Sequence, residues 1–169
     1  MKTFPTSIKA ADEKIQTDIL NLVNSVRTQI EKDPVGIPNG IALLSELRSA
    51  IYEDLNQIQH EELIVRSVEW LKINGYGKTK LKWYWNPRQT GGATEPDIRI
   101  ESEGVVIVSA EASTSLHPNG SIDVRMKNTL EKLSCMEGKK FYFVRTPEME
   151  KRATSKLLKS NWEIEVVTL

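Results

Sequence analysis

Two acidic residues, Asp97 and Glu111, are the best candidates in this sequence for a metal-binding or catalytic site. Asp97 directly follows Pro96, and Glu111 comes shortly after an apolar run from Val105 to Val108. A polar turn at residues 101–104 separates the two segments, so the pattern predicts a hairpin of two strands. We expect both carboxylates at one end of the sheet. Buried acids need a cation or hydrogen-bond donors, and converging carboxylates favour Mg²⁺, or Mn²⁺ in its place.

These residues also carry a resemblance to a known family. Pro96-Asp97, followed by Glu111-Ala112-Ser113 at the end of an apolar strand, resembles the active-site signature of the PD-(D/E)XK nuclease superfamily, which includes type II restriction endonucleases. The resemblance implies that Asp97, Glu111 and the carbonyl of Ala112 bind the metal. Ser113 stands where the family has a lysine, so the signature lacks its positive charge.

Three outcomes follow from serine at position 113. The cation could have moved to a neighbouring element, with Arg99, Arg125 and Lys127 as candidates. Ser113 could instead suffice on its own, with a second metal ion supplying the charge. In the third outcome the site is inert and the fold is kept for binding.

A further acidic residue is expected from the helix that precedes the strands. The apolar stripe that contains Ile58 reaches Glu62 four residues later, and a carboxylate on an apolar face requires a reason. The resemblance supplies one, because many such nucleases place a helical Glu beside the metal. Glu61 is the alternative if the helix breaks near His60, and a solvated acidic pair is the simpler explanation.

Basic residues are unevenly distributed along the chain. Residues 1–75 carry 8 Lys or Arg and 11 Asp or Glu, whereas residues 76–169 carry 15 and 12, although the whole chain is neutral. The half with the acidic signature is thus the basic half, which favours a polyanionic partner such as DNA. Four residues are the candidate nucleic-acid contacts: Lys82, Arg88, Arg99 and Arg125. Basic and aromatic residues are interleaved from Lys80 to Trp85, and the favoured explanation is an outer strand whose aromatics cover the core, with contact to nucleic acid as the alternative.

Periodicity predicts the elements that must position these residues. Helical patterns cover residues 12–32, 41–58, 59–74, 122–136 and 147–159; strand patterns cover 80–85, 97–100, 105–113, 139–144 and 162–167. The fold class predicted is α/β, and the resemblance implies a restriction-endonuclease-like αβββαβ core, a central mixed sheet flanked by helices. We expect an N-terminal helical region at residues 1–58, for packing, dimerisation or DNA contact, and a nuclease-like core at 59–169.

Composition sets the remaining expectations. A hydrophobic fraction of 39% and a charged fraction of 27% are those of a folded globular protein. The single cysteine, Cys135, excludes an internal disulfide and falls in an apolar helical pattern, which predicts a buried thiol and a reducing compartment. No segment has the length of a membrane span or the pattern of a secretory signal, so a cytoplasmic location without membrane contact is expected. Nothing in the sequence indicates an organic cofactor.

The function predicted is that of a metal-dependent DNA endonuclease of the restriction type, acting as a homodimer with one site per strand. The alternative is a catalytically inactive module on the nuclease fold that binds nucleic acid or a protein partner. A third possibility is an unrelated α/β protein in which Asp97 and Glu111 are ordinary carboxylates at strand ends.

Overall fold

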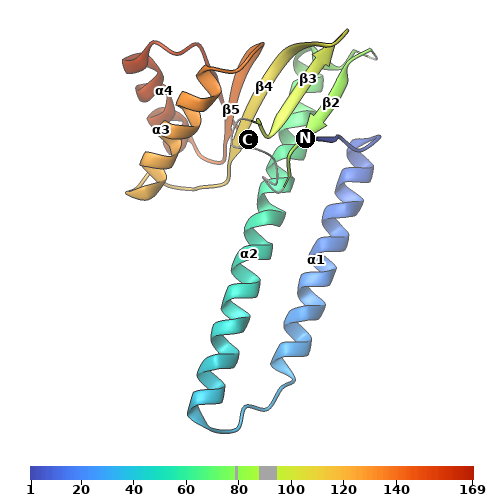
Figure 1. Cartoon of the computed structure of the whole chain (residues 1–169), viewed down its shortest axis with the longest axis vertical. Helices are drawn as coiled ribbons and strands as arrows, with labels where there is room; N and C mark the ends of the chain where they lie inside the picture. The colour runs from blue at the N-terminus through green and yellow to red at the C-terminus, as the bar shows by residue number, and fades with distance from the viewer. Residues whose placement is uncertain (79, 88–94) are drawn as a thin grey trace.

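A six-stranded mixed sheet with helices on both faces forms the body of the protein in the computed structural model, which describes residues 1–78, 80–87 and 95–169 (Figure 1). The strands are β1 (Lys2–Thr3), β2 (Lys82–Trp85), β3 (Ile98–Ser102), β4 (Val105–Ser113), β5 (Lys139–Val144) and β6 (Glu165–Thr168), in that spatial order. The first four pair antiparallel, and β4, β5 and β6 are parallel. The α/β class is therefore confirmed.

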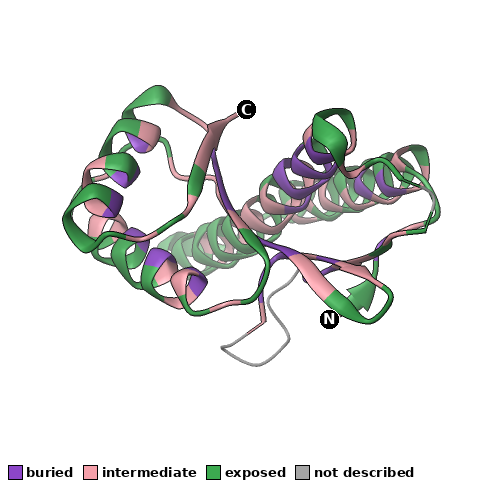
Figure 2. Ribbon diagram, turned by 90° about the horizontal axis from the view of Figure 1, so that it is seen from above, coloured by how far each residue is buried: buried purple, intermediate pink, exposed green. Residues whose placement is uncertain are grey.

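Helices α1 (Ile8–Ile30) and α2 (Gly36–Leu71) cover one face of the sheet, and α3 (Ser121–Ser134) and α4 (Pro147–Ser160) cover the other (Figure 2). Each face has its own apolar core. Ile64 and Val68 of α2 pack on Ile98 and Phe143 on one side. Met126 and Leu130 of α3 pack with Tyr142 on the other. Among the described helices, none is long and apolar enough to cross a membrane.

The order of the elements that follow the N-terminal helices agrees with the order predicted from the sequence. The second N-terminal helix, however, is longer than predicted. The patterns at 41–58 and 59–74 form one helix, α2, followed by a π-helical turn from Lys72 to Tyr76. The boundary expected at residue 58 thus falls inside α2. Residues from the N-terminal region also enter the body, since β1 pairs with β2 and Phe4 is buried in the core.

The β3–β4 hairpin is tighter than expected. Its turn is Glu103-Gly104, with positive φ angles of 52° and 83°, which is the backbone of a type I′ turn. Val105 is exposed and Val106 and Ile107 are half-buried, so β4 is fully buried only from Val108 to Glu111. The apolar run therefore begins at the rim of the sheet rather than inside it. The hairpin still brings residues 97 and 111 to the same end of the sheet.

Two local features fix how β4 and β5 meet. Gly138 has a φ of +73°, and a Cβ there would lie 2.5 Å from the carbonyl carbon of Ile107, so only glycine lets the chain enter β5 this close to β4. The preceding helix α3 ends at Ser134, which leaves Cys135 exposed as its C-terminal cap. The expectation of a buried thiol was wrong, because Cys135 lies on the opposite side of the helix from the buried stripe of Met126, Leu130 and Leu133.

Candidate metal-binding active site

Asp97 and Glu111 lie side by side and are almost fully buried, with exposed fractions of 2% and 3%. Asp97 immediately precedes β3, and Glu111 lies near the end of β4, where Ile98 pairs with Ala110. The two carboxyl groups are close enough for the negative charge of Asp97 to disfavour ionisation of Glu111. Two carboxylates this close cannot both stay ionised without compensation, so the pair has to share a proton or face cations.

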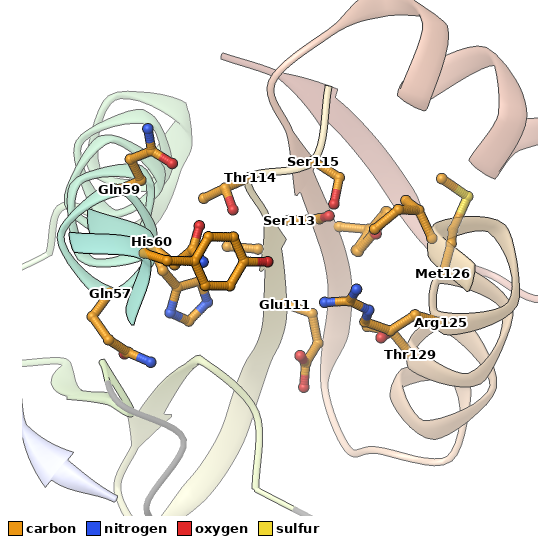
Figure 3. A pocket seen from close by; sticks show the side chains of 15 residues that line it. Gln57, Gln59, His60, Glu111, Ser113, Thr114, Ser115, Arg125, Met126 and Thr129 are labelled. Atoms are coloured by element: carbon orange, nitrogen blue, oxygen red, sulfur yellow. The ribbon is translucent and has the colours of Figure 1, made fainter. Parts of the chain in front are cut away.

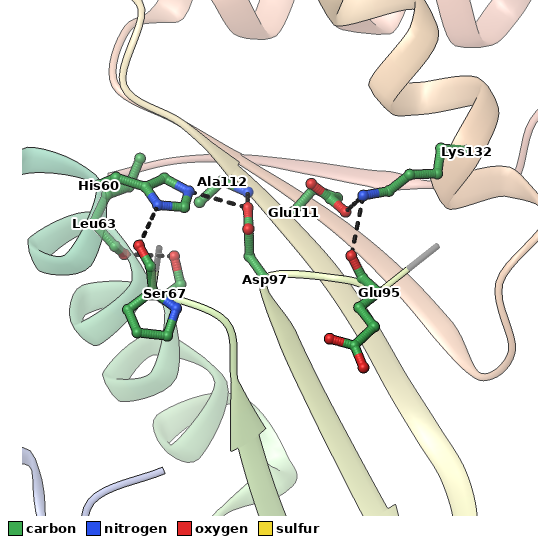
Figure 4. A network of polar contacts seen from close by, with 9 residues as sticks. His60, Leu63, Ser67, Glu95, Asp97, Glu111, Ala112 and Lys132 are labelled. Atoms are coloured by element: carbon green, nitrogen blue, oxygen red, sulfur yellow. Dashed lines mark hydrogen bonds and ion pairs between the residues drawn. The ribbon is translucent and has the colours of Figure 1, made fainter. Parts of the chain in front are cut away.

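Each member of the pair is met by a positively charged or donating group (Figure 4). Lys132 of α3 places its ammonium 2.5 Å from Oε1 of Glu111 and donates to the carbonyl of Glu95 at 3.1 Å. The backbone N–H of Ala112 donates to Oδ2 of Asp97 at 2.8 Å. Glu111 is therefore held by a side chain of α3, and Asp97 by the backbone of β4.

His60 of α2 completes the cluster. Its Nε2 lies 3.2 Å from Oδ2 of Asp97 and its Nδ1 lies 3.2 Å from the carbonyl of Pro87. A carbonyl and a carboxylate only accept hydrogen bonds, so the doubly protonated imidazolium satisfies both contacts. Burial disfavours that charged form, but the hydrogen bond and attraction to Asp97 outweigh it and raise the pKa of His60.

Burial is also the main cause of the unusual acidity of Glu111. Loss of water around its carboxylate, together with the nearby charge of Asp97, raises the pKa of Glu111 to about 8, although the Lys132 ammonium acts in the opposite direction. At pH values between 4.5, the ordinary pKa of this side chain, and about 8, the acidic pair holds a proton. The pair would release that proton on binding a divalent cation. The donor set, two adjacent carboxylates, fits a hard cation such as Mg²⁺.

Glu111 opens onto a cavity of about 340 Å³ between α2 and α3 (Figure 3). His60 lines it from α2, Glu111 and Ser113 line it from β4, and Arg125 and Thr129 line it from α3. Most of the side chains around it are polar. Burial raises the pKa of the Tyr142 phenol, which also lines the cavity, to about 12, so Tyr142 stays protonated. The cavity therefore combines a carboxyl group, an imidazole and a guanidinium.

The structure does not bring Glu62 to the acidic pair. Glu62 forms ion pairs with Arg145 and, at 3.6 Å, with Arg66. Glu61, the alternative, is buried and pairs with Lys14 of α1 at 2.5 Å. The helical residue that reaches Asp97 is His60 instead. Because α2 continues unbroken through this region, a residue two positions after His60 points to a different side of the helix.

The cation beside Glu111 is Lys132, and the sequence pointed to other residues. Lys127 is exposed on α3, and Arg99 pairs with Glu101 at 3.1 Å and lies over the ring of Tyr84. A signal for Lys132 does exist in the sequence. Arg125, Thr129 and Lys132 recur at helical spacing along one edge of the buried stripe of α3, which is the edge that faces the cavity and Glu111.

The remaining predicted contacts are spread over the molecule. Arg125 points across the cavity toward Glu111 (Figure 3), whereas Lys82 is exposed on β2. Arg88 lies outside the described residues. The structure brings the backbone N–H of Ala112 to Asp97, while the role of its carbonyl as a metal ligand stays a prediction.

Within the described part of the chain, no group of three or more His, Cys, Asp or Glu side chains is arranged to hold a metal ion. The predicted site has two such side chains and one backbone carbonyl, so it is smaller than a group of that kind. Comparison with protein-family models, with curated proteins and with solved structures finds no match to this chain.

Proposed function

We propose that this protein is a Mg²⁺-dependent endonuclease that hydrolyses phosphodiester bonds in DNA, on a restriction-endonuclease-like αβββαβ core. One observation carries the proposal: the buried pair of Asp97 and Glu111 meets Lys132 at the edge of a polar cavity. The sequence pattern that suggested a nuclease lacked only a cation beside its second acid. Lys132 supports the first of the three outcomes, in which that cation comes from a neighbouring element.

Each group in the cavity has a defined part in this chemistry. A divalent cation bound by Asp97 and Glu111 would neutralise charge on the phosphate and acidify a water molecule. The ammonium of Lys132 would stabilise the negative charge that develops beside Glu111. Ser113 cannot do this, because its side chain carries no positive charge. Arg125 would bind a phosphate oxygen across the cavity.

His60 has a positioning part. Its imidazolium bridges Asp97 and the carbonyl of Pro87, and so ties α2 to the segment that leads into β3. The same contact balances the charge of Asp97 while no cation is bound. Hydrogen-bonded partners of this kind fix the orientation of a metal-binding carboxylate.

The direct experiment is to incubate the protein with supercoiled plasmid DNA and Mg²⁺, with Mn²⁺ in place of Mg²⁺, and with EDTA. We expect nicked or linear DNA with either metal ion and intact DNA with EDTA. Intact DNA under all three conditions, with the protein folded, would contradict the proposal. Single-stranded DNA and RNA in parallel define which polymer is cut.

A non-catalytic module on the same fold is the second candidate, and one observation favours it. Asp97 and Glu111 are already held by Lys132, His60 and the N–H of Ala112, so the cluster is balanced without a cation. In that case the protein would bind DNA or a protein partner equally well with and without EDTA. Retention of labelled DNA in a gel-shift experiment with no cleavage would support this candidate.

A further inference from the structure

The hairpin of α1 and α2 extends far beyond the sheet (Figure 1). Only the end of α2 near the sheet is buried, from Glu61 to Leu71, and α1 has buried residues only at Ala11 and Ile15. The distal half of the hairpin therefore consists of two helices that pack on each other alone. Two isolated helices cannot bury both of their apolar faces.

Each helix of the hairpin carries two apolar stripes. In α2 the stripe of Leu43, Leu47, Ile51 and Ile58 is half-buried. A second stripe is exposed and consists of Ile37, Ile41, Leu44 and Leu55, with exposed fractions of 80%, 61%, 65% and 42%. In α1, Leu22 and Val26 are half-buried, while Ile19, Val23 and Ile30 are exposed.

The exposed stripes of the two helices lie on the same side of the hairpin. At ~3.6 residues per turn, the exposed stripe of each helix is rotated about the helix axis by about a quarter turn from the half-buried stripe. The rotation has the sense in which the chain winds around the axis, and it is the same in both helices. The helices run antiparallel (Figure 1) and face each other through their half-buried stripes. Because the helices are antiparallel and face each other, this equal rotation places both exposed stripes on the same side of the hairpin. We call this side the hairpin face: Ile19, Val23 and Ile30 of α1 with Ile37, Ile41, Leu44 and Leu55 of α2.

We propose that the hairpin face binds the hairpin face of a second copy of this chain, so that two hairpins form a four-helix bundle. From Ile37 to Leu55 the face is ~27 Å long and two helices make it ~20 Å wide, or roughly 500 Å², the order of the ~800 Å² that each partner buries in a standard interface. A patch of this size equals the largest apolar patch of a typical monomer, and such patches are often functional.

Charge favours a protein partner over a polyanion. Between residues 8 and 58 the hairpin carries five basic and eight acidic residues, so it does not attract nucleic acid or an anionic membrane surface. A self-complementary apolar face is the feature that a symmetric dimer needs, because the same patch then serves both subunits. The cavity with Glu111 involves another side of α2, so dimerisation would leave both sites open.

The test is the mass of the full-length protein in solution, by light scattering after size exclusion or by sedimentation velocity. We expect twice 19.2 kDa for the unchanged chain and 19.2 kDa for Ile41→Glu combined with Leu44→Glu. Both side chains are largely exposed in one copy, so the circular dichroism spectrum should not change. Ile30→Glu with Ile37→Glu, at the far end of the hairpin, provides a second disruption that avoids the body of the protein.

Leu158→Glu is the matched control, because Leu158 is 80% exposed on α4 and the change is the same. This variant should remain a dimer. A monomeric unchanged chain would overturn the proposal, as would dimers of both double variants or a monomer of the control. Plasmid cleavage by each variant is read separately, so a failure of dimerisation and a failure of the proposed nuclease activity are distinguishable.

Discussion

Asp97→Asn should reduce metal-dependent cleavage at least ~100-fold while the protein stays folded, the size of loss seen when one preorganised charge contact is removed from an active site. The amide keeps an oxygen for the N–H of Ala112, which Asp97 now accepts at 2.8 Å, so the start of β3 keeps its anchor. The negative charge is lost, however, and with it half of the proposed cation site. Cleavage rates on plasmid DNA with saturating protein measure the effect.

Asp123→Asn is the matched control for this substitution. Asp123 lies on α3, where it pairs with Arg152 and Lys156, which pull its pKa well below the usual range. These ion pairs join α3 to α4 and do not involve Asp97 or Glu111, so the substitution should leave cleavage unchanged. Equal cleavage by Asp97→Asn and the unchanged protein would remove Asp97 from the mechanism, while equal losses in both variants would indicate a general effect on folding.

Lys132→Met should lower cleavage by about 100-fold and make stability more sensitive to pH. The ammonium is the cation that approaches Glu111, and methionine keeps much of its length without the charge. Lys127→Met on the same helix is the comparison. Lys127 is the cation that the sequence suggested, and Lys132 is the cation that lies beside Glu111 in the structure. Cleavage should be lost with Lys132 and kept with Lys127; the opposite pattern would refute the role of Lys132.

The pH dependence follows from the raised pKa of Glu111. Between its ordinary pKa of 4.5 and about 8, the folded state binds a proton that the unfolded state does not, so the free energy of unfolding falls as pH rises. Without Lys132 the pKa of Glu111 rises further. The variant should therefore match the normal protein closely at pH 6 and lose about 1–2 kcal/mol more at pH 9, less than for a fully buried pair because Lys132 is partly exposed. Urea denaturation at both pH values measures this, and an equal loss at both would contradict it.

The sequence was sufficient for the class and order of the elements and for the pairing of Asp97 with Glu111. Both follow from local signals, namely apolar periodicity and a turn that sets the hairpin. The sequence was not sufficient for His60, because its role depends on α2 running unbroken past residue 58. Nothing in the local pattern distinguishes a continuous helix from two short ones there.

Lys132 and Glu62 illustrate the same limit at longer range. Which edge of α3 faces β4 is decided by how the helix packs on the sheet, so the sequence led to Lys127 on one edge and missed Lys132 on the other. Glu62 faces Arg145, which follows β5 and is distant in sequence. The hairpin face of α1 and α2 could not be predicted either, because the sequence does not distinguish an exposed apolar stripe from a buried one.

Binding of a divalent cation by Asp97 and Glu111 together can be measured by titration with Mn²⁺ followed by electron paramagnetic resonance. The titration is done at about pH 8.5, where Glu111 has released its proton. We expect saturable binding to the unchanged protein that is lost in Asp97→Asn and in Glu111→Gln. Binding of Mn²⁺ that is absent from all three proteins, or equal in all three, would contradict it.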